Sequence, residues 1–296
     1  MIYTNNMVAI ITLKHKPVGG ITMRSLLTVL SLCIILPAFS LQSQTLPPSI
    51  DTAREALNES PRHGEFVDID FPEGEHPIKS WVVFPERPTR APVIIVIHEI
   101  FGLTDWIRAI ADDLAQEGYL AIAPDFISGL GPDGGGTESF EDRDDIVRTI
   151  RNLTPDTVTN ILNAVRDYAL TIPAATENVA VIGFCWGGAM SFHYATEQPE
   201  LNAAVVFYGT SPDTDLLQKV ESPVLGLYAE DDARVNVTIE PAAEEMERLG
   251  KTYEWYMYPG AGHGFVRQQE GRDGANLAAT ERAWEQMFIF LHEHLE

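Results

Sequence analysis

The 296-residue sequence predicts an α/β fold with a mostly parallel, doubly wound sheet flanked by helices. Strand-like and helix-like segments alternate along most of the chain, as they do where helical crossovers join parallel strands. Residues 93–97 form a continuous β-branched run, which is typical of a central strand covered on both faces. A second apolar run at residues 179–182 leads directly into a glycine-rich turn and a segment of small residues, which indicates a sharp passage from strand to helix.

Eight segments have the composition of strands. The first alternates apolar and acidic side chains, as a half-buried edge strand does. The eight segments are residues 66–71, 80–84, 93–97, 119–123, 179–182, 203–208, 224–228 and 253–258.

Helices are predicted from apolar spacing and from capping residues. A short helix is expected near residues 51–58, and a longer one carries Trp106, Ile110 and Leu114 four residues apart. Thr154 precedes a proline and an aspartate, which together form a strong helix-start signal. The apolar stripe of the last helix consists of Leu277, Trp284, Met287, Phe288 and Leu291.

Residues 127–153 are predicted to form a lid-like excursion from the α/β domain. Five glycines between residues 129 and 136 give this segment flexibility, and residues 138–145 are rich in acids. Loops of this length usually cover or line binding sites. The glycines do not predict a phosphate-binding loop, because no Gly-Lys-Ser/Thr sequence follows them.

The N-terminus has the pattern of a signal peptide. Residues 1–40 contain no Asp or Glu, and Met23, the expected true start, is followed by an arginine and an apolar stretch. Ala38 and Ser40 supply the small residues of a cleavage site. An uncleaved membrane anchor is the alternative interpretation.

Removal of the leader at residues 1–40 would give an exported protein, periplasmic or extracellular. Residues 41–62 would then be a linker and short N-terminal segment, and residues 63–296 would be the α/β domain. No apolar run of about 18 residues lies inside that domain, so we expect no stable membrane span after cleavage.

The net charge and the cysteine count limit the binding partners and the disulfides that we expect. The net charge is −23, and the acidic surface that this predicts would repel polyanions, so we expect no nucleic-acid partner. Of the two cysteines, only Cys185 would remain after loss of the leader, which excludes an intramolecular disulfide in the mature chain. The sequence leaves the oligomeric state open.

Cys185 is the candidate nucleophile. Residues 183–188 read Gly-Phe-Cys-Trp-Gly-Gly directly after a buried-type strand. This is the form of a nucleophile elbow, with cysteine in the place of the usual serine. A helix N-terminus at this turn would favour the reactive thiolate. A buried structural cysteine at a tight strand–helix junction is the alternative.

Asp232 and His263 are the candidate partners of the thiol. In such sites the acid and the histidine follow the nucleophile in that order. Asp232 lies just past the strand at residues 224–228 and three residues before a valine, which favours it over Asp231. His263 lies in a glycine-lined loop after the last strand, and glycines allow such a loop to direct an imidazole inward.

The loop after the central strand supplies the remaining candidates. The backbone N–H groups of Ile100 and Trp186 are the expected donors of an oxyanion hole. His98 and Glu99 also allow a metal-site interpretation, but no third ligand stands at a useful spacing. We therefore expect no metal.

These motifs resemble those of the dienelactone hydrolase family. The resemblance covers about residues 64–294 and implies an α/β-hydrolase fold, a Cys–His–Asp triad, no cofactor and a small ester or lactone as substrate. It also implies that Glu99 holds the resting thiol and releases it when substrate arrives, and that Arg267 contacts a substrate carboxylate. The candidates for a second substrate-binding arginine are Arg143, Arg148 and Arg151.

The sequence departs from the family at Asn236, where a proline is common. Two other functions remain open: a general carboxylesterase or thioesterase of the same fold, and a non-catalytic member that binds a ligand.

Overall fold

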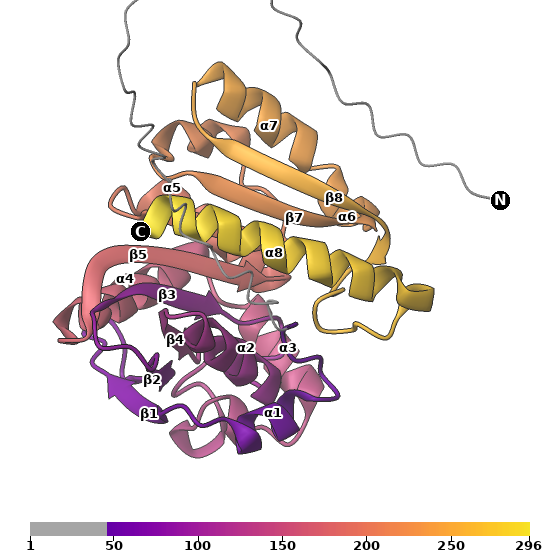
Figure 1. Cartoon of the computed structure of the whole chain (residues 1–296). Coiled ribbons are helices and arrows are strands. Elements are labelled where there is room, and N and C mark those ends of the chain that lie inside the picture. Colours follow the sequence, from indigo (N-terminus) through magenta and orange to yellow (C-terminus); the bar gives the residue numbers. More distant parts are fainter. Residues whose placement is uncertain (1–45) are drawn as a thin grey trace, which may run out of the picture. The chain divides into compact units, whose positions relative to one another are not determined.

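The computed structural model describes residues 46–296, so the predicted leader, with Met23, lies outside the described residues. An eight-stranded sheet with helices on both faces forms the body of this part of the chain (Figure 1). The predicted α/β fold is therefore confirmed. The strands are β1 (Gly64–Ile69), β2 (Ile78–Val83), β3 (Ala91–Ile97), β4 (Leu120–Pro124), β5 (Ala175–Phe184), β6 (Ala203–Phe207), β7 (Val224–Asp231) and β8 (Tyr253–Gly262).

The strands are ordered β1-β2-β4-β3-β5-β6-β7-β8. β1 and β2 pair antiparallel with each other, β2 pairs antiparallel with β4, and all the other pairs are parallel. The connection from β3 leads to β4 on one side, and the connection from β5 leads to β6 on the other side. The β3–β5 pair is therefore the switch point of the sheet. Ligands of open α/β sheets bind at the carboxyl ends of the strands at such a point.

Two groups of helices cover the two faces of the sheet. α2 (Asp105–Gln116) and α8 (Ala275–Leu295) pack into one buried apolar cluster. α4 (Pro155–Thr171), α5 (Trp186–Glu197) and α7 (Ile239–Arg248) pack into the other. The short helices are α1 (Ala53–Glu59), α3 (Arg143–Arg151) and α6 (Ala233–Asn236). Within residues 46–296, no helix combines the length and apolarity needed to cross a membrane.

Most predicted elements lie within a few residues of their positions in the structure. The Thr154 side chain accepts a hydrogen bond from Thr157 N at the start of α4, as its capping signal predicts. The prediction that Leu277 belongs to the apolar stripe of α8 is wrong, because its side chain is 38% exposed in the first turn of the helix.

The segment at residues 127–153 is more ordered than the glycines predict. It contains two short 3-10 turns and the helix α3, which Asp142 caps through a hydrogen bond from Asp144 N. Ile146 and Ile150 of α3 are buried against Ile127. The periodic apolar pair of α3 was obscured in the sequence by the acids around it.

A buried carboxyl in α2 makes stability depend on pH. Burial raises the pKa of Asp113 to about 7, although the Trp284 indole N–H donates to it at 2.9 Å. An unfolded aspartate titrates near pH 4, so the folded state binds this proton more tightly. Stability should therefore fall as pH rises from about 4 to about 7, and the loss should persist above that.

We expect Asp113→Asn to stabilise the protein at pH 8 by on the order of 2 kcal/mol and to have little effect at pH 4. Asparagine keeps an oxygen that can accept from Trp284 and removes the charge. Urea unfolding at the two pH values measures the difference. An equal effect at pH 4 and pH 8 would show that the charge is not the cause.

Candidate active site

The turn between β5 and α5 holds Cys185 in a conformation that side chains rarely adopt. Its φ is +56° and its ψ is −114°, at the N-cap of α5. The turn is tight because Gly183 and Gly187 touch backbone. A Cβ on Gly183 would lie 1.9 Å from the carbonyl oxygen of Gly187, and a Cβ on Gly187 would lie 2.4 Å from that of His98. The glycines of the motif thus permit a tight elbow, which places Cys185 at the carboxyl end of β5.

The three side chains predicted to act together lie in contact at the carboxyl end of the sheet. Cys185 Sγ is 3.0 Å from His263 Nε2, and His263 Nδ1 is 2.5 Å from Asp232 Oδ2. Asp232 is only 9% exposed. The neighbouring Asp231 instead pairs with Arg272 and is exposed. The structure therefore brings Asp232, the favoured acid, to the histidine.

The contacts of His263 favour its protonated form. Burial alone would lower the pKa of His263, but its hydrogen bonds to Asp232 and Cys185 outweigh burial and raise the pKa to about 9. An imidazolium in this position can balance the charge of a thiolate. The raised pKa therefore favours a positive charge on His263, whose Nε2 lies 3.0 Å from the Cys185 sulfur.

Asn236 fixes the turn that carries Asp232. Its Nδ2 donates to the carbonyl oxygens of Ala229 and Glu230, each at 3.0 Å. The proline expected at this position from the family resemblance could not make these side-chain bonds. This chain thus stabilises the end of β7 by side-chain hydrogen bonds.

Glu99 and Arg267 form an ion pair beside the three contacting residues. Glu99 is 4% exposed, and its Oε2 lies 3.2 Å from Arg267 Nε. Burial raises the pKa of Glu99 to about 7, against the opposing charges of Arg267, His263 and Arg143. The structure pairs Glu99 with Arg267 and the thiol with His263, whereas the resemblance implied that Glu99 holds the resting thiol.

Of the three candidate second arginines, the structure brings Arg143 to this region. Its guanidinium carbon lies 3.5 Å from the centre of the Phe101 ring, and that of Arg267 lies 5.1 Å from the same centre. Arg148 pairs with Asp145 on the exposed side of α3, and Arg151 is exposed.

The expected oxyanion donors lie at the switch point of the sheet. Ile97 pairs with Gly183, so the loop after β3, with Ile100, and the elbow, with Trp186, leave the sheet side by side. Trp186 is the first residue of α5, where backbone N–H groups have no acceptor within the helix.

His98 has a structural environment. It is fully buried, its Nδ1 is 2.7 Å from the carbonyl oxygen of Glu99, and Phe126 N donates to its Nε2 at 3.3 Å. Its ring also stacks on Trp186 at 5.6 Å. Within residues 46–296 no three His, Cys, Asp or Glu side chains gather in a way that could hold a metal ion.

Tyr208 also lies in the site, although no sequence pattern predicts it there. This residue directly follows β6 and has a φ of +40°; it is fully buried and packs edge-on against the His263 ring at 5.2 Å. Burial raises the pKa of Tyr208 well above its usual value, and the nearby Glu99 and Cys185 act in the same direction. Only packing between strands distant in sequence brings it here.

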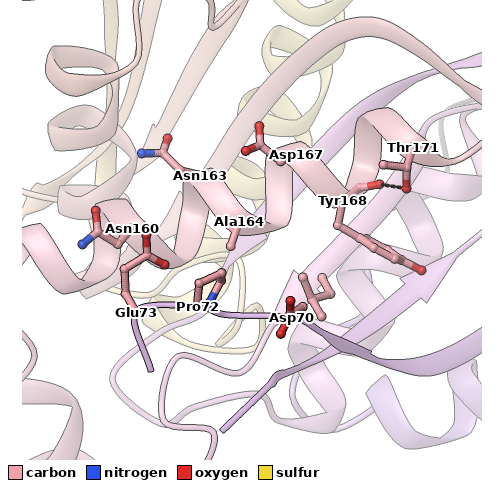
Figure 2. A pocket seen from close by; sticks show the side chains of 10 residues that line it. Asp70, Pro72, Glu73, Asn160, Asn163, Ala164, Asp167, Tyr168 and Thr171 are labelled. Atoms are coloured by element: carbon pink, nitrogen blue, oxygen red, sulfur yellow. Dashed lines mark hydrogen bonds between the residues drawn. The ribbon is translucent and has the colours of Figure 1, made fainter. Parts of the chain in front are cut away.

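A separate cavity of about 440 Å³ lies between the end of β1 and α4 (Figure 2). Asp70, Glu73 and Asp167 make it acidic, and Asn160 and Asn163 also line it. None of the side chains around Cys185 lines this cavity.

Comparison with known proteins identifies the family. The sequence profile of the dienelactone hydrolase family matches residues 78–295. This chain belongs to the dienelactone hydrolase family. The α/β-hydrolase fold implied by the motifs is thereby confirmed, and the matched range contains the whole Cys185–His263–Asp232 arrangement.

Individual relatives agree with this assignment. A protein of Saccharolobus solfataricus, named as a candidate carboxymethylenebutenolidase, is 30% identical over 72% of this chain and 93% of its own length. A carboxymethylenebutenolidase homolog of Xenopus tropicalis is 31% identical over 75% of this chain and 89% of its own. The crystal structure of a candidate dienelactone hydrolase from Klebsiella pneumoniae superposes with a TM-score of 0.66 at 27% identity, covering 77% of this chain and 98% of that one.

Proposed function

We propose that this dienelactone hydrolase family member hydrolyses small esters or lactones, with Cys185 as nucleophile, His263 as acid–base and Asp232 as the group that orients the imidazole. The observation that supports this most is the continuous series of contacts from Sγ through the imidazole to the carboxylate, at 3.0 Å and 2.5 Å.

In the first half-reaction, the Cys185 thiolate attacks the carbonyl carbon and forms a C–S bond. The backbone N–H groups of Ile100 and Trp186 stabilise the oxyanion, and each such donor contributes about 3–4 kcal/mol in comparable sites. The His263 imidazolium then donates its proton to the leaving alkoxide as the C–O bond breaks. In a lactone, the resulting alcohol stays attached to the acyl group.

In the second half-reaction, neutral His263 removes a proton from water, and the hydroxide attacks the thioester carbonyl. The tetrahedral intermediate collapses, the C–S bond breaks and the thiolate returns beside the imidazolium. The products are a carboxylic acid and an alcohol, and no cofactor enters the balance.

Arg267 is proposed to bind a carboxylate on the substrate. A substrate carboxylate would compete with Glu99 for this guanidinium, and its arrival would release a carboxylate whose pKa is raised to about 7 by burial. The names of the relatives, carboxymethylenebutenolidases, agree with a carboxylated substrate.

The substrate class can be tested with three compounds: a neutral chromogenic acetate ester, a carboxylated unsaturated lactone, and the methyl ester of that lactone's carboxylate. A kcat/KM at least tenfold higher for the carboxylated lactone than for its methyl ester supports the lactonase. Equal values favour a general carboxylesterase or thioesterase. No turnover of any compound favours a non-catalytic binding protein.

Arg267→Ala is expected to lower kcat/KM for the carboxylated lactone by about 10–100-fold, as loss of a charged hydrogen-bonding partner does. Turnover of the neutral acetate ester should change by less than about threefold. Arg148→Ala is the matched control, because Arg148 lies on the exposed side of α3. Equal losses on charged and neutral substrates would contradict a carboxylate-binding role.

We also propose that the protein is exported after cleavage near Ser40, because of the leader pattern in residues 1–40. The N-terminal sequence and the cell fraction of the protein expressed from its full gene would test this. Full-length protein in the cytoplasm would contradict it.

A further inference from the structure

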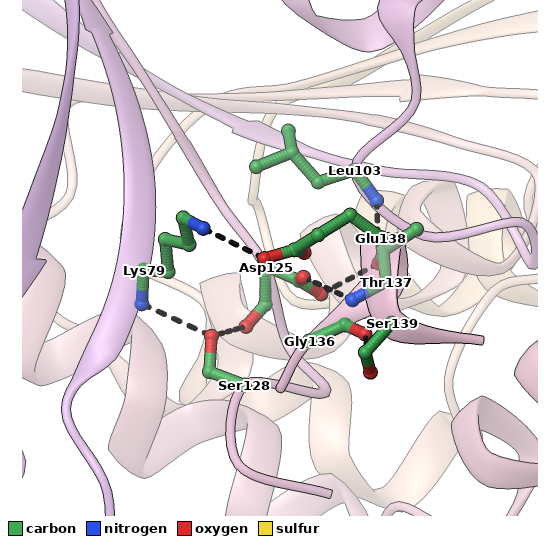
Figure 3. Close-up of polar contacts among 8 residues, drawn as sticks. All are labelled: Lys79, Leu103, Asp125, Ser128, Gly136, Thr137, Glu138 and Ser139. Carbon is green, nitrogen blue, oxygen red and sulfur yellow. Dashed lines mark hydrogen bonds and ion pairs between the residues drawn. The ribbon is translucent and has the colours of Figure 1, made fainter. Parts of the chain in front are cut away.

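A buried carboxylate at the end of β4 organises a network that the mechanism above does not use. Asp125 is 1% exposed. Its Oδ2 accepts a hydrogen bond from Thr137 N at 2.6 Å, and its Oδ1 accepts one from Thr137 Oγ1 at 2.8 Å (Figure 3). These two bonds hold the middle of the 127–153 segment against the sheet.

Thr137 also contacts the loop that follows β3. Leu103 N donates to Thr137 Oγ1 at 3.1 Å (Figure 3). A hydroxyl has one proton, so when it donates to Asp125 its lone pairs are free to accept from Leu103. The buried carboxylate thus orients the hydroxyl, and the hydroxyl holds the backbone of the loop.

The loop held in this way carries an expected oxyanion donor. Glu99, Ile100 and Leu103 all lie in it, and Gly102 closes its turn through a bond from its N to the Glu99 carbonyl oxygen at 3.3 Å. Gly102 has a φ of +77°, and a Cβ there would lie 2.2 Å from Thr137 Oγ1. The threonine therefore packs directly on the turn.

Further bonds anchor the base of the same segment. Lys79 N of β2 donates to Ser128 Oγ at 3.0 Å, and Ser128 Oγ donates to the Asp125 carbonyl oxygen at 2.7 Å. Lys79 Nζ lies 2.6 Å from Glu138 Oε1, next to Thr137 in the chain (Figure 3). Thr137 is thus held from both sides, and it can act as a fixed support.

We propose that Thr137, oriented by Asp125, is a positioning residue that fixes the loop after β3 so that Ile100 N–H is directed at the oxyanion. This inference rests on the proposed function. It assigns the 127–153 segment a role in the chemical step.

The test compares Thr137→Val, which keeps the shape and removes the hydroxyl, with Thr137→Ser, which keeps the hydroxyl. Two rates are measured for each: hydrolysis of the chromogenic acetate ester, and alkylation at Cys185 by iodoacetamide, followed by peptide mapping. Ester attack needs an oxyanion hole, whereas displacement of iodide by the thiolate does not. The two rates therefore separate the oxyanion hole from the thiol.

We expect Thr137→Val to lower kcat by about 10–100-fold, less than the loss of a whole donor. Its KM and its alkylation rate should stay within about twofold of the wild-type values, and Thr137→Ser should keep at least about a third of wild-type kcat. Should Thr137→Val fail to fold, Asp125→Asn provides the same comparison, because it weakens the acceptor that orients the hydroxyl.

Full kcat in a folded Thr137→Val protein would overturn the inference and leave the proposed function intact. Equal losses of hydrolysis and alkylation would also overturn it, because they would show a general disturbance of the site. No ester hydrolysis by the wild-type protein would contradict the proposed function itself, and the inference with it.

Discussion

Replacing Cys185 with alanine is expected to lower kcat/KM for ester hydrolysis by at least about 10³-fold, because removal of the nucleophile of a triad leaves only binding and the oxyanion hole. The backbone at this position has a φ of +56°, and both residues carry a Cβ, so alanine fits the elbow as cysteine does. The loss should therefore occur without a change in fold.

The measurement is steady-state hydrolysis of the chromogenic ester, together with circular dichroism and thermal unfolding of the same preparation. Cys185→Ser is the matched control, because it keeps a nucleophilic atom in the same place and should retain more activity than alanine. A folded Cys185→Ala protein with activity within tenfold of wild type would mean that another group attacks the substrate.

Replacing His263 with alanine should have the second largest effect, because in the proposed mechanism this residue both stabilises the thiolate and transfers the proton. General acid–base catalysis alone contributes about 10²–10⁴-fold. The wild-type pKa of about 9 keeps His263 protonated beside the thiol at pH 7, and alanine removes that positive charge. We therefore expect a loss of at least about 10²-fold in kcat and slower alkylation of Cys185 at pH 7.

His193→Ala is a suitable control for this substitution. His193 lies within α5, outside the contacts around Cys185, and burial lowers the pKa of its imidazole. The His193→Ala protein should hydrolyse the ester and undergo alkylation at Cys185 at rates near those of the wild type. Unchanged alkylation in His263→Ala would contradict the charge-pairing role, even if hydrolysis were lost.

Local sequence patterns were sufficient to predict the sheet, the elbow and the approach of His263 and Asp232 to the thiol. Each of these follows from residues close together in the chain: an apolar run, glycines where backbone touches backbone, and polar residues directly after strands. The order of the parallel strands then brings their carboxyl ends to one edge.

The rest of the site depends on contacts between distant segments. Thr137 and Asp125 are 12 residues apart and carry no motif, yet one hydroxyl joins the end of β4 to the loop after β3. Tyr208, after β6, reaches His263, after β8, because both strands pair with β7 in the sheet. The pairing of Glu99 with Arg267 depends on the packing of two loops 168 residues apart.

The central claim is that Cys185 carries out the reaction, and progressive alkylation of the protein tests it most directly. Samples are withdrawn during treatment with iodoacetamide, and the modified fraction of Cys185, determined by peptide mass spectrometry, is compared with the remaining ester hydrolysis. We expect the activity to fall in proportion to the unmodified fraction and to reach zero at full modification. A saturating substrate should slow both the modification of Cys185 and the loss of activity. Hydrolysis that persists after every Cys185 thiol has been alkylated would contradict the mechanism.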